Sequence, residues 1–567
     1  MDIRRRSVIG LGVAAGVAVA AAARAAEVAP TFDVKTVAAR YREALEDIRV
    51  YAARHVAAYG LPGLTLAVVV PGGAVALMRF GSANVETREP VGPDHLFQIG
   101  SISKSFTALC IFRLMEAGKL QLSDDIRTYL PDAPLPGGAI ITIQHLLNHS
   151  SGLPDDAPMF PYGGDRKLWR GYQPGSHWSY SNLGFALLSH IVERVSGRPF
   201  GEFMQTEVLT PLEMADTKPL ILVRDRALYA TGYAPQFGNR PFPLGGRIAP
   251  GPWTPMVEGS GSVASTAQDM GRYTRFLIAA GQGHGAPLLS DTAAVQFTKA
   301  TVEAPAWGSG GGEYANGLAV VDVGGRKLLH HTGGMLIFNS AIHVDPIAGV
   351  GAFASTNMGS FPYRPRDITA YACARLRAVV EDGPKPEPLP APPKLPDASG
   401  YVGRFEARDG EALTVEIDPR GLSVRLGDLR LTLEQSGEDA FTASDPAATP
   451  LPLVFRKAMD KTVVRVWWGE TEYVRDGAEF SPPTPAKLAA LTGYYESDDP
   501  WRGSFRVIAQ GPDLTVDGST PLTPLGAGVY RAGKDAWSPE RLRFGALLDG
   551  RPQRATASGA DYLRRPA

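Results

Sequence analysis

Residues 97–107 of this chain read Phe97-Gln98-Ile99-Gly100-Ser101-Ile102-Ser103-Lys104-Ser105-Phe106-Thr107, and an apolar run from Ala108 to Met115 follows. This pattern predicts a helix that begins near Ser101 and carries Lys104 one turn later on the same face. A serine hydroxyl is a poor nucleophile unless a neighbouring base takes its proton. A lysine that is partly desolvated and near other positive groups can lose its charge and fill that role. The backbone N–H groups at the helix start would also face a developing oxyanion.

Two further segments follow this stretch in order. Tyr180-Ser181-Asn182 precedes a helical pattern from Leu183 to Val195. His331-Thr332-Gly333-Gly334 follows the strand-like segment from Arg326 to His330. Alone, each segment has a purely structural interpretation, such as a serine cap with a surface lysine, or an asparagine that caps the helix before Leu183.

Together, S-x-x-K, Y-x-N and H-x-G resemble the serine β-lactamase and penicillin-binding-protein superfamily, of the class C type. The segments Leu146–Leu153 and Ser262–Met270 resemble two secondary markers of that superfamily. The resemblance extends over about residues 35 to 380 and implies an α/β (α+β) catalytic domain. In such a domain, helices flank an antiparallel sheet, a helical subdomain lies beside it, and the active-site cleft lies between the two.

The resemblance also implies a role for each motif residue. Ser101 is the expected nucleophile, and Lys104 is the base or the group that sets the pKa of the base. Tyr180 would pass the proton between the serine and the leaving group, with Lys104 and His331 as the candidate cations that stabilise its phenolate. The expected substrate and oxyanion contacts are Asn182, His331, Gly333 and Gly334, with the backbone N–H groups of Ser101 and Gly334 forming the oxyanion hole.

The third motif departs from the Lys-Thr-Gly of β-lactamases and D,D-peptidases, because His331 occupies the lysine position. A neutral imidazole attracts a carboxylate far less than an ammonium group does. The H-x-G variant is similar to that of the superfamily's esterases and D-aminopeptidases, which favours ester hydrolysis. His330 would point to the opposite side of a strand and is expected to be structural.

The N-terminus reads as an export signal. Arg4-Arg5-Arg6-Ser7-Val8-Ile9 is a twin-arginine pattern, and Ala23-Arg24-Ala25 fits a cleavage site, so residues 1–25 are predicted to be a signal peptide. The apolar stretch from Val8 to Ala23 is shorter than the roughly 20 residues that a membrane-spanning helix needs. We therefore expect a periplasmic protein without a stable membrane span.

Composition excludes several classes of function. The 567 residues are 44% hydrophobic and 20% charged with a net charge of -1, so no basic patch points to nucleic acid. The absence of HExxH and CxxC spacings implies no metal, and no cofactor is expected. A G-x-S-x-G nucleophile elbow is also missing, which argues against an α/β-hydrolase. The two cysteines, Cys110 and Cys373, are expected to be buried free thiols.

The chain divides into five parts. After the signal peptide, residues 33–380 form the expected catalytic domain, with a first helix over Val34–Tyr59 and strands over Leu64–Val70 and Ala74–Phe80. A proline-rich linker at 381–396 is expected to be stiff and extended. Residues 397–480 and 486–567 are predicted to form two small antiparallel β-barrels of lipocalin-like type, each of roughly eight strands.

The barrel prediction rests on a repeat with a period of about 90 residues. Gly403-Arg404-Phe405-Glu406 returns as Gly493-Tyr494-Tyr495-Glu496, and Tyr473-Val474-Arg475 returns as Tyr562-Leu563-Arg564. This layout resembles the D-aminopeptidases of the superfamily, which carry two such barrels. The barrels would brace the catalytic domain, send a loop to the site that restricts substrate size, or bind sugars.

These observations predict a periplasmic serine hydrolase that works through an acyl-enzyme on Ser101. Its expected partner is a small-molecule, glycan or peptide ester from the cell envelope, such as an acylated peptidoglycan fragment or periplasmic glucan. A D-aminopeptidase, or an amide hydrolase of the D,D-carboxypeptidase or β-lactamase type, is the alternative. A catalytically idle, penicillin-recognising scaffold or sensor is the alternative of another class. The sequence leaves the oligomeric state open.

Overall fold

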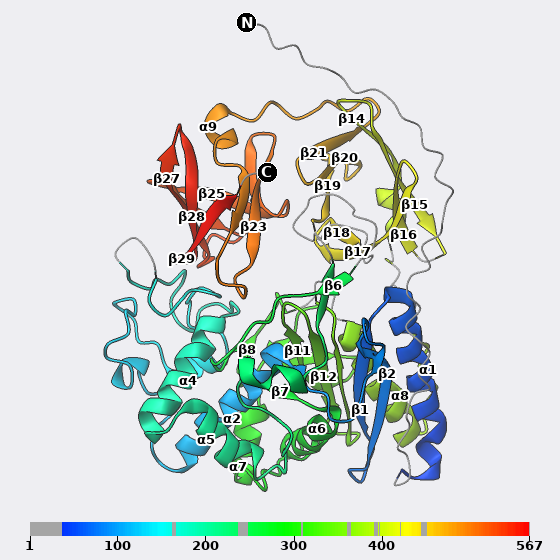
Figure 1. Ribbon diagram of the computed structural model, residues 1–567, viewed down its shortest axis with the longest axis vertical. Helices are drawn as coiled ribbons and strands as arrows, with labels where there is room; N and C mark the ends of the chain where they lie inside the picture. The colour runs from blue at the N-terminus through cyan, green and yellow to red at the C-terminus, as the bar shows by residue number, and fades with distance from the viewer. Residues whose placement is uncertain are drawn as a thin grey trace, which may run out of the picture.

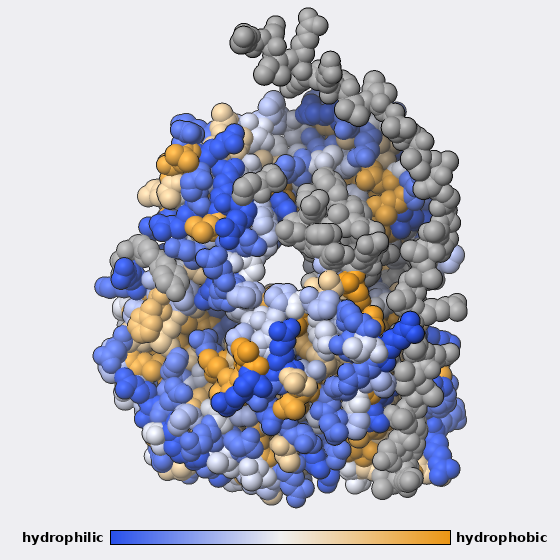
Figure 2. All heavy atoms as spheres, viewed as in Figure 1, coloured by the Kyte–Doolittle hydropathy of each residue, from blue (hydrophilic) through white to orange (hydrophobic). Residues whose placement is uncertain are grey.

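The computed structural model describes residues 37–161, 166–235, 248–307, 310–359, 364–389, 395, 397–419, 421–443 and 451–565. The predicted signal peptide lies outside these residues. Figure 1 shows a domain of sheet and helices in the lower half of the molecule, with two barrels next to each other above it. The space-filling view shows an opening where the barrels meet the lower domain (Figure 2).

A nine-stranded antiparallel sheet forms the centre of the lower domain, in the order β3-β2-β1-β13-β12-β11-β10-β9-β8. Its strands are β1 (Gly63–Val69), β2 (Val75–Asn84), β3 (Glu89–Pro90), β8 (Val302–Glu303), β9 (Glu313–Tyr314), β10 (Ala319–Asp322), β11 (Lys327–Gly334), β12 (Asn339–Asp345) and β13 (Val350–Thr356). Every residue of β1, β12 and β13 is buried, because helices cover both faces of the sheet.

Helices α1 (Arg42–Tyr59) and α8 (Arg364–Val380) cover one face of the sheet, and α6 (Ala267–Gly281) packs against β1 and β13 on the other. The expected helix start at Val34 lies outside the described residues, and within them Ala38, with φ -58° and ψ 143°, is not helical. A short 3-10 turn at Ala39–Tyr41 precedes α1 instead. The second strand continues past the expected Phe80 to Asn84.

The helical part of the lower domain surrounds α2 (Ser103–Glu116), whose residues from Ser103 to Phe112 are all buried. The surrounding helices are α3 (Ile143–Leu147), α4 (Asn182–Ser196), α5 (Phe200–Met204) and α7 (Asp291–Thr298). One hydrophobic core joins these helices to the inner face of the sheet. Cys110 and Cys373 are both buried and free.

The upper part of the molecule consists of two closed antiparallel barrels, as the repeat predicts. The first barrel contains β14 (Gly403–Ala407), β15 (Ala412–Asp418), β16 (Gly421–Leu426), β17 (Leu429–Gly437), β18 (Ala440–Ala443), β19 (Leu453–Lys457), β20 (Val463–Trp468) and β21 (Thr471–Arg475). The second, preceded by α9 (Ala486–Ala489), contains β22 (Gly493–Glu496), β23 (Ser504–Gln510), β24 (Asp513–Val516), β25 (Thr520–Gly526), β26 (Val529–Ala532), β27 (Arg541–Leu548), β28 (Arg551–Ala557) and β29 (Ala560–Arg565).

Equivalent residues make the same contact in each barrel. A Cβ atom at Gly403 would lie 2.8 Å from the guanidinium of Arg475, and a Cβ atom at Gly493 would lie 2.8 Å from that of Arg564. The arginine ends could shift, but φ is +155° at Gly403 and +154° at Gly493, a backbone conformation that residues with a side chain rarely adopt, so each barrel favours glycine where its first strand passes the arginine of its last strand. The repeat in the sequence therefore marks a repeated packing contact.

Both barrels are anchored on the lower domain. Arg364 at the start of α8 forms a buried ion pair with Glu434 of the first barrel. In the second barrel, the ring of Trp537 stacks on His177 with a centroid separation of 4.8 Å. The carbonyl oxygen of Pro539 accepts a hydrogen bond from Trp169 Nε1 at 2.6 Å. The second barrel thus contacts the loop that leads into α4.

Candidate active site

Ser101 lies in a 3-10 turn, Gly100–Ile102, directly before α2 and not in the first turn of the helix itself. The end of β11 packs against this turn so closely that only glycine fits. A Cβ atom at Gly333 would lie 1.9 Å from the carbonyl oxygen of Ile99, and one at Gly100 would lie 2.8 Å from that of Gly334. The backbones of Ser101 and Gly334, the expected oxyanion donors, are therefore close neighbours.

Lys104 is completely buried on α2. Its Nζ atom donates to Ser101 Oγ at 3.0 Å, to Asn182 Oδ1 at 2.6 Å and to the carbonyl oxygen of Ser260 at 2.7 Å. A neutral amine has only two N–H groups, which can serve the carbonyl-type acceptors Asn182 and Ser260. Its lone pair then faces the hydroxyl of Ser101, so this geometry allows Lys104 to accept the serine proton.

Burial lowers the pKa of Lys104 to about 7, while the charges of Asp155 and Asp156 act in the opposite direction. Of the two general ways to depress a lysine pKa, desolvation and nearby positive charge, only desolvation acts on Lys104. Desolvation alone depresses the pKa, and acidic neighbours limit how far it falls. The lysine consequently changes its protonation state near neutral pH, as a general base must.

Tyr180 is half-buried, and the centre of its ring lies 4.8 Å from Lys104 Nζ. Its ring also packs against His149 with a centroid separation of 4.3 Å, and against Trp307 at 6.0 Å. These aromatic neighbours hold Tyr180 beside the lysine, where the resemblance to the superfamily places the proton shuttle.

Asn182 is the first residue of α4, and the helix is capped by the side chain of Ser181, not by Asn182 as one structural interpretation had it. Ser181 Oγ accepts from the N–H of Gly184 at 3.0 Å. This leaves the Asn182 amide free for the active site. Its Nδ2 donates to Asp156 Oδ1 at 3.0 Å, which turns its Oδ1 toward Lys104.

His331 is completely buried, and burial together with Lys104 holds its pKa well below the ordinary value. Its Nδ1 atom lies 2.6 Å from the carbonyl oxygen of Thr332, and its Nε2 atom lies 2.8 Å from the hydroxyl of Tyr314. A carbonyl only accepts, so Nδ1 carries the proton and Nε2 accepts from Tyr314. The imidazole is neutral, and the expectation that it could act as a cation beside Tyr180 was wrong.

The same reasoning shows which ring nitrogen of a second histidine, His149, carries the proton. His149 Nδ1 accepts from the N–H of Ser181 at 3.0 Å, so its proton is on Nε2, which lies 3.2 Å from the Tyr314 hydroxyl. Hydrogen bonds therefore run in one direction from His149 through Tyr314 and His331 to the carbonyl of Thr332. Burial lowers the pKa of His149 as well, which agrees with this neutral network.

Several of these residues were not predicted as site residues from the sequence. His149, Asp155 and Asp156 lie in or just after the Leu146–Leu153 marker, so a signal for them was present. Ser260 and Tyr314 carry no motif that the sequence analysis recognised. Ser260 reaches the site because its part of the chain packs against α2, and Tyr314 reaches it because β9 pairs with β10, which pairs with β11.

Residues of the second barrel approach this site from outside. Glu540 Oε1 accepts from the N–H of Asp155 at 2.8 Å, and Arg502 donates to the carbonyl oxygen of Asp156 at 2.5 Å. Both contacts are on the residues that hold Asn182. Three roles were considered for the barrels: bracing the catalytic domain, sending a segment to the active site, and binding sugars. These contacts support the second role.

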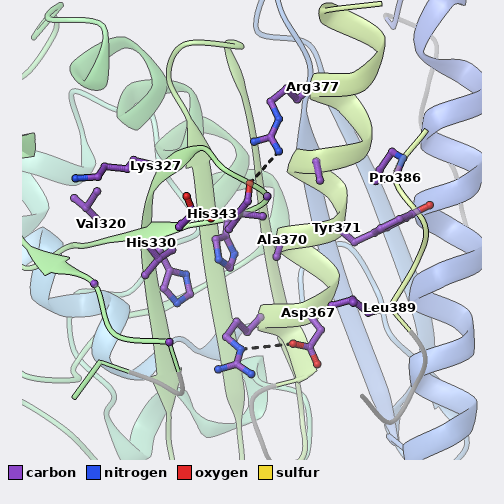
Figure 3. Close-up of a pocket in the computed structure, with 18 of the residues that line it drawn as sticks. Val320, Lys327, His330, His343, Asp367, Ala370, Tyr371, Arg377, Pro386 and Leu389 are labelled. Carbon is purple, nitrogen blue, oxygen red and sulfur yellow. Dashed lines mark hydrogen bonds and ion pairs between the residues drawn. The ribbon is translucent and has the colours of Figure 1, made fainter. Parts of the chain in front are cut away.

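A cavity of about 1550 Å³ among the described residues lies elsewhere (Figure 3). It is bounded by β10, β11, α8 and the chain after α8, and its lining includes none of the seven predicted site residues. His330 lies in this wall, stacked on His343 with a centroid separation of 4.0 Å. His330 thus points away from the site, as strand alternation predicts.

Two features are absent from the described residues. No group of three or more His, Cys, Asp or Glu side chains there could hold a metal ion. Within the same ranges, no helix combines the length and apolar character needed to cross a bilayer.

Comparison with known proteins identifies relatives for the lower domain. The family model described as Beta-lactamase matches residues 48–376. Penicillin-binding protein 4* of Bacillus subtilis (strain 168) is 31% identical over 224 residues, which cover 35% of this chain and 48% of that protein. D-aminopeptidase of Gluconobacter oxydans (strain 621H) is 36% identical over 171 residues, which cover 25% of this chain and 31% of that protein.

The chain thus spans about half or less of the length of these two relatives. Among solved structures, the octameric penicillin-binding protein homologue from Pyrococcus abyssi matches with a TM-score of 0.56 and 24% identity. That match covers 76% of this chain and 100% of the other, and it supports a shared fold.

Proposed function

The chain belongs to the Beta-lactamase family, and from that premise we propose that it is a serine carboxylesterase acting on small acyl esters through a Ser101 acyl-enzyme. Relatives in this family imply serine hydrolase activity. The preference for esters over amides is the new element of the proposal. It rests on the third motif and on the groups around Lys104.

In the first half of the reaction, neutral Lys104 takes the proton of Ser101 as Oγ attacks the ester carbonyl carbon. The negative charge that develops on the carbonyl oxygen is stabilised by the backbone N–H groups of Ser101 and Gly334. When the C–O bond to the alcohol breaks, Tyr180 delivers a proton to the departing oxygen and recovers one from Lys104. The products are an alcohol and an acyl-enzyme on Ser101.

In the second half, water attacks the acyl carbon. The water gives up a proton through Tyr180 and Lys104, and Ser101 Oγ leaves as the free hydroxyl. The carboxylic acid is released and the enzyme returns to its starting state. Atoms and charges balance over the two halves, which amount to hydrolysis of one ester bond.

The observation that carries the proposal is the hydrogen bonding of His331. Both of its ring nitrogens are engaged inside the protein, and the ring is neutral. The position where β-lactamases carry a lysine therefore offers no charge to a substrate carboxylate. Asp155 and Asp156 nearby would repel such a group. Substrates without a carboxylate beside the scissile bond fit these charges best.

We propose an ester of a cell-envelope component as the natural substrate, such as an acylated peptidoglycan fragment or periplasmic glucan. The N-terminal twin-arginine pattern supports export to the periplasm, where such esters occur. A soluble sugar or peptide ester would also suit a site whose approach carries the partly exposed residues Tyr180 and Trp307.

A D-aminopeptidase is the second candidate. The pair Asp155 and Asp156 beside Asn182 has the charge that attracts a free amino group. The similarity to a D-aminopeptidase supports this candidate too. An idle penicillin-recognising scaffold has less support, because Lys104 and Asn182 are arranged for proton transfer.

The test is to measure hydrolysis of a short-acyl p-nitrophenyl ester, a chromogenic cephalosporin and a D-alanyl p-nitroanilide by the full chain. Ser101→Ala is the matched control for each. Ester turnover that depends on Ser101, with the other two near background, supports the esterase. Turnover of the D-alanyl amide at a comparable rate would replace it with the aminopeptidase, and no turnover of any substrate would favour the scaffold.

A further inference from the structure

The second barrel is connected to the catalytic lysine by an unbroken series of contacts. Glu540 Oε1 accepts from the N–H of Asp155 at 2.8 Å, and Asp155 Oδ1 accepts from the N–H of Asn182 at 2.8 Å. Asn182 Oδ1 in turn accepts from Lys104 Nζ at 2.6 Å. Glu540, just before β27, is thus linked through Asp155 and Asn182 to Lys104, the base that activates Ser101.

The Glu540 contact is held in place by its surroundings. Its second oxygen accepts a short hydrogen bond from Ser558 on the same barrel. The neighbouring Pro539 and Trp537 contact Trp169 and His177 of the catalytic domain. Gly171 is needed there, because a Cβ atom would lie 2.1 Å from the Trp537 carbonyl oxygen. Close packing therefore fixes where the Glu540 carboxylate lies.

We propose that Asp155 and Glu540 are positioning residues that act on Lys104, through Asn182 and through their charges, and so make the second barrel part of the catalytic apparatus. Asp155 fixes the first residue of α4, and Glu540 fixes Asp155. This role goes beyond the bracing function considered for the barrels. It rests on the proposed serine hydrolase activity but not on which ester is the substrate.

The charges that face Lys104, Asp155 and Glu540 predict how each carboxylate affects the protonation of Lys104. Asp155 and Asp156 face Lys104 and favour its protonated form, while the buried His149 and His331 face it as neutral rings. Burial raises the pKa of Asp155 well above its ordinary value, the facing Asp156 and Glu540 raise it further, and the hydrogen bond from Asn182 and the charge of Lys104 act against them. Asp156 also faces Glu540, and burial raises the pKa of Glu540.

Removing the charge of Asp155 should therefore shift the pKa of Lys104 in one direction, and removing the charge of Glu540 should shift it in the other. Asp155→Asn keeps an oxygen that accepts from Asn182 but removes the charge that favours protonated Lys104, so Lys104 should lose its proton at lower pH. Glu540→Gln keeps an oxygen for the Asp155 N–H but removes the charge that opposes ionisation of Asp155. Asp155 is then more often ionised, and Lys104 should lose its proton at higher pH.

The experiment is the pH dependence of Ser101 acylation in the full chain, measured with a p-nitrophenyl ester and independently with a fluorophosphonate that labels the serine. The acidic limb of the acylation-rate profile reports the loss of the Lys104 proton. We expect this limb to move by about half a pH unit, to lower pH in Asp155→Asn and to higher pH in Glu540→Gln. Asp517→Asn is the matched control. Asp517 is another carboxyl of the second barrel with a pKa raised by burial, to about 6, and its hydrogen bond comes from Arg506 within that barrel.

Opposite shifts in the two variants, with none in Asp517→Asn, support the proposal. Shifts in the same direction, or an unmoved limb in folded Glu540→Gln, overturn it and leave Asp155 and Glu540 with a structural role. Glu540→Gln decides the matter alone if Asp155→Asn does not fold, because an upward shift is not expected from loosened packing. Fluorophosphonate labelling without ester turnover would refute the esterase proposal while the positioning test still stands.

Discussion

The hydroxyl of Tyr314 lies 2.8 Å from Nε2 of His331, whose pKa burial and the charge of Lys104 hold well below its ordinary value. The tyrosine donates to the imidazole, which donates in turn to the carbonyl of Thr332 at 2.6 Å. A protonated His331 would have two donors and would lose its acceptor for Tyr314. Burial and this pairing together leave the site without the charge that the lysine of β-lactamases carries at this position.

Replacing the histidine by the ordinary lysine of the motif tests this point. In His331→Lys, an ammonium group would face the substrate side of β11 and could attract a carboxylate. We expect acylation by a fluorescent penicillin to become at least about tenfold faster, with ester hydrolysis slower. His331→Gln is the neutral control, and an equal gain in that variant would contradict the electrostatic explanation. The readout is the rate of fluorescent labelling of Ser101.

The pH dependence of ester hydrolysis should follow Lys104. Its pKa of about 7 means that the amine is charged and inactive as a base below that pH, and neutral above it. The value of kcat/KM should therefore rise through pH 7 and level off above it. A profile that is flat between pH 5 and 8 would contradict the assignment of Lys104 as the base.

Lys104→Arg gives a sharper test, because arginine keeps the charge but does not lose its proton. We expect kcat to fall by about a thousandfold or more, while the fold survives or is weakened by the larger side chain. Circular dichroism and thermal unfolding separate the two effects. A folded Lys104→Arg enzyme with nearly normal turnover would show that another group removes the serine proton.

Gly333→Ala should disrupt the junction between β11 and the nucleophile turn. The added Cβ would lie 1.9 Å from the carbonyl oxygen of Ile99, so the strand or the turn has to move. We expect a loss of about 2–4 kcal/mol in unfolding free energy and at least tenfold lower activity. Gly137→Ala is the matched control, because a Cβ there has no atom within 4 Å. Denaturant unfolding of both variants measures the difference.

The stacked histidines behind the sheet should make the protein less stable in acid. Burial lowers the pKa of His330 to about 3 and that of His343 well below its ordinary value of 6.5. The unfolded chain therefore takes up protons below pH 6.5 that, in the folded protein, His330 refuses until about pH 3 and His343 refuses until well below pH 6.5. Stability from this pair is complete above pH 6.5 and falls by about 1.4 kcal/mol per pH unit and histidine below it.

Unfolding curves at several pH values between 7 and 5 check this expectation. The decline of unfolding free energy with falling pH should be shallower in His330→Gln than in the original chain, because one proton uptake is removed. Other titrating groups are common to both proteins and cancel in the comparison. An unchanged slope would mean that His330 is already protonated in the folded state.

Much of the fold could be predicted from local patterns. The apolar run after Lys104 predicted α2, and the alternation around His331 predicted a strand with His330 on its other face. The repeat that matches Gly403 with Gly493 predicted two barrels, because equivalent glycines and arginines meet in each. Capping was less predictable: Ser181, one residue before Asn182, supplies the cap of α4.

The electrostatics of the site depended on tertiary contacts that no spacing reveals. Tyr314 reaches His331 through the pairing of β9, β10 and β11, and Ser260 reaches Lys104 across 156 residues of chain. Glu540 reaches Asp155 across 385 residues. The motifs identified which residues meet, whereas the protonation of Lys104 and His331 follows from partners that only the folded chain brings to them.

Peptide mass spectrometry after brief mixing tests the acyl-enzyme on Ser101 most directly. The full chain is mixed with a short-acyl p-nitrophenyl ester or with benzylpenicillin, quenched in acid and digested. We predict that the ester adds its acyl mass to the peptide containing Ser101, that Ser101→Ala carries no adduct, and that penicillin labels far more slowly. An adduct on another residue, or faster labelling by penicillin than by the ester, would contradict a carboxylate-excluding esterase.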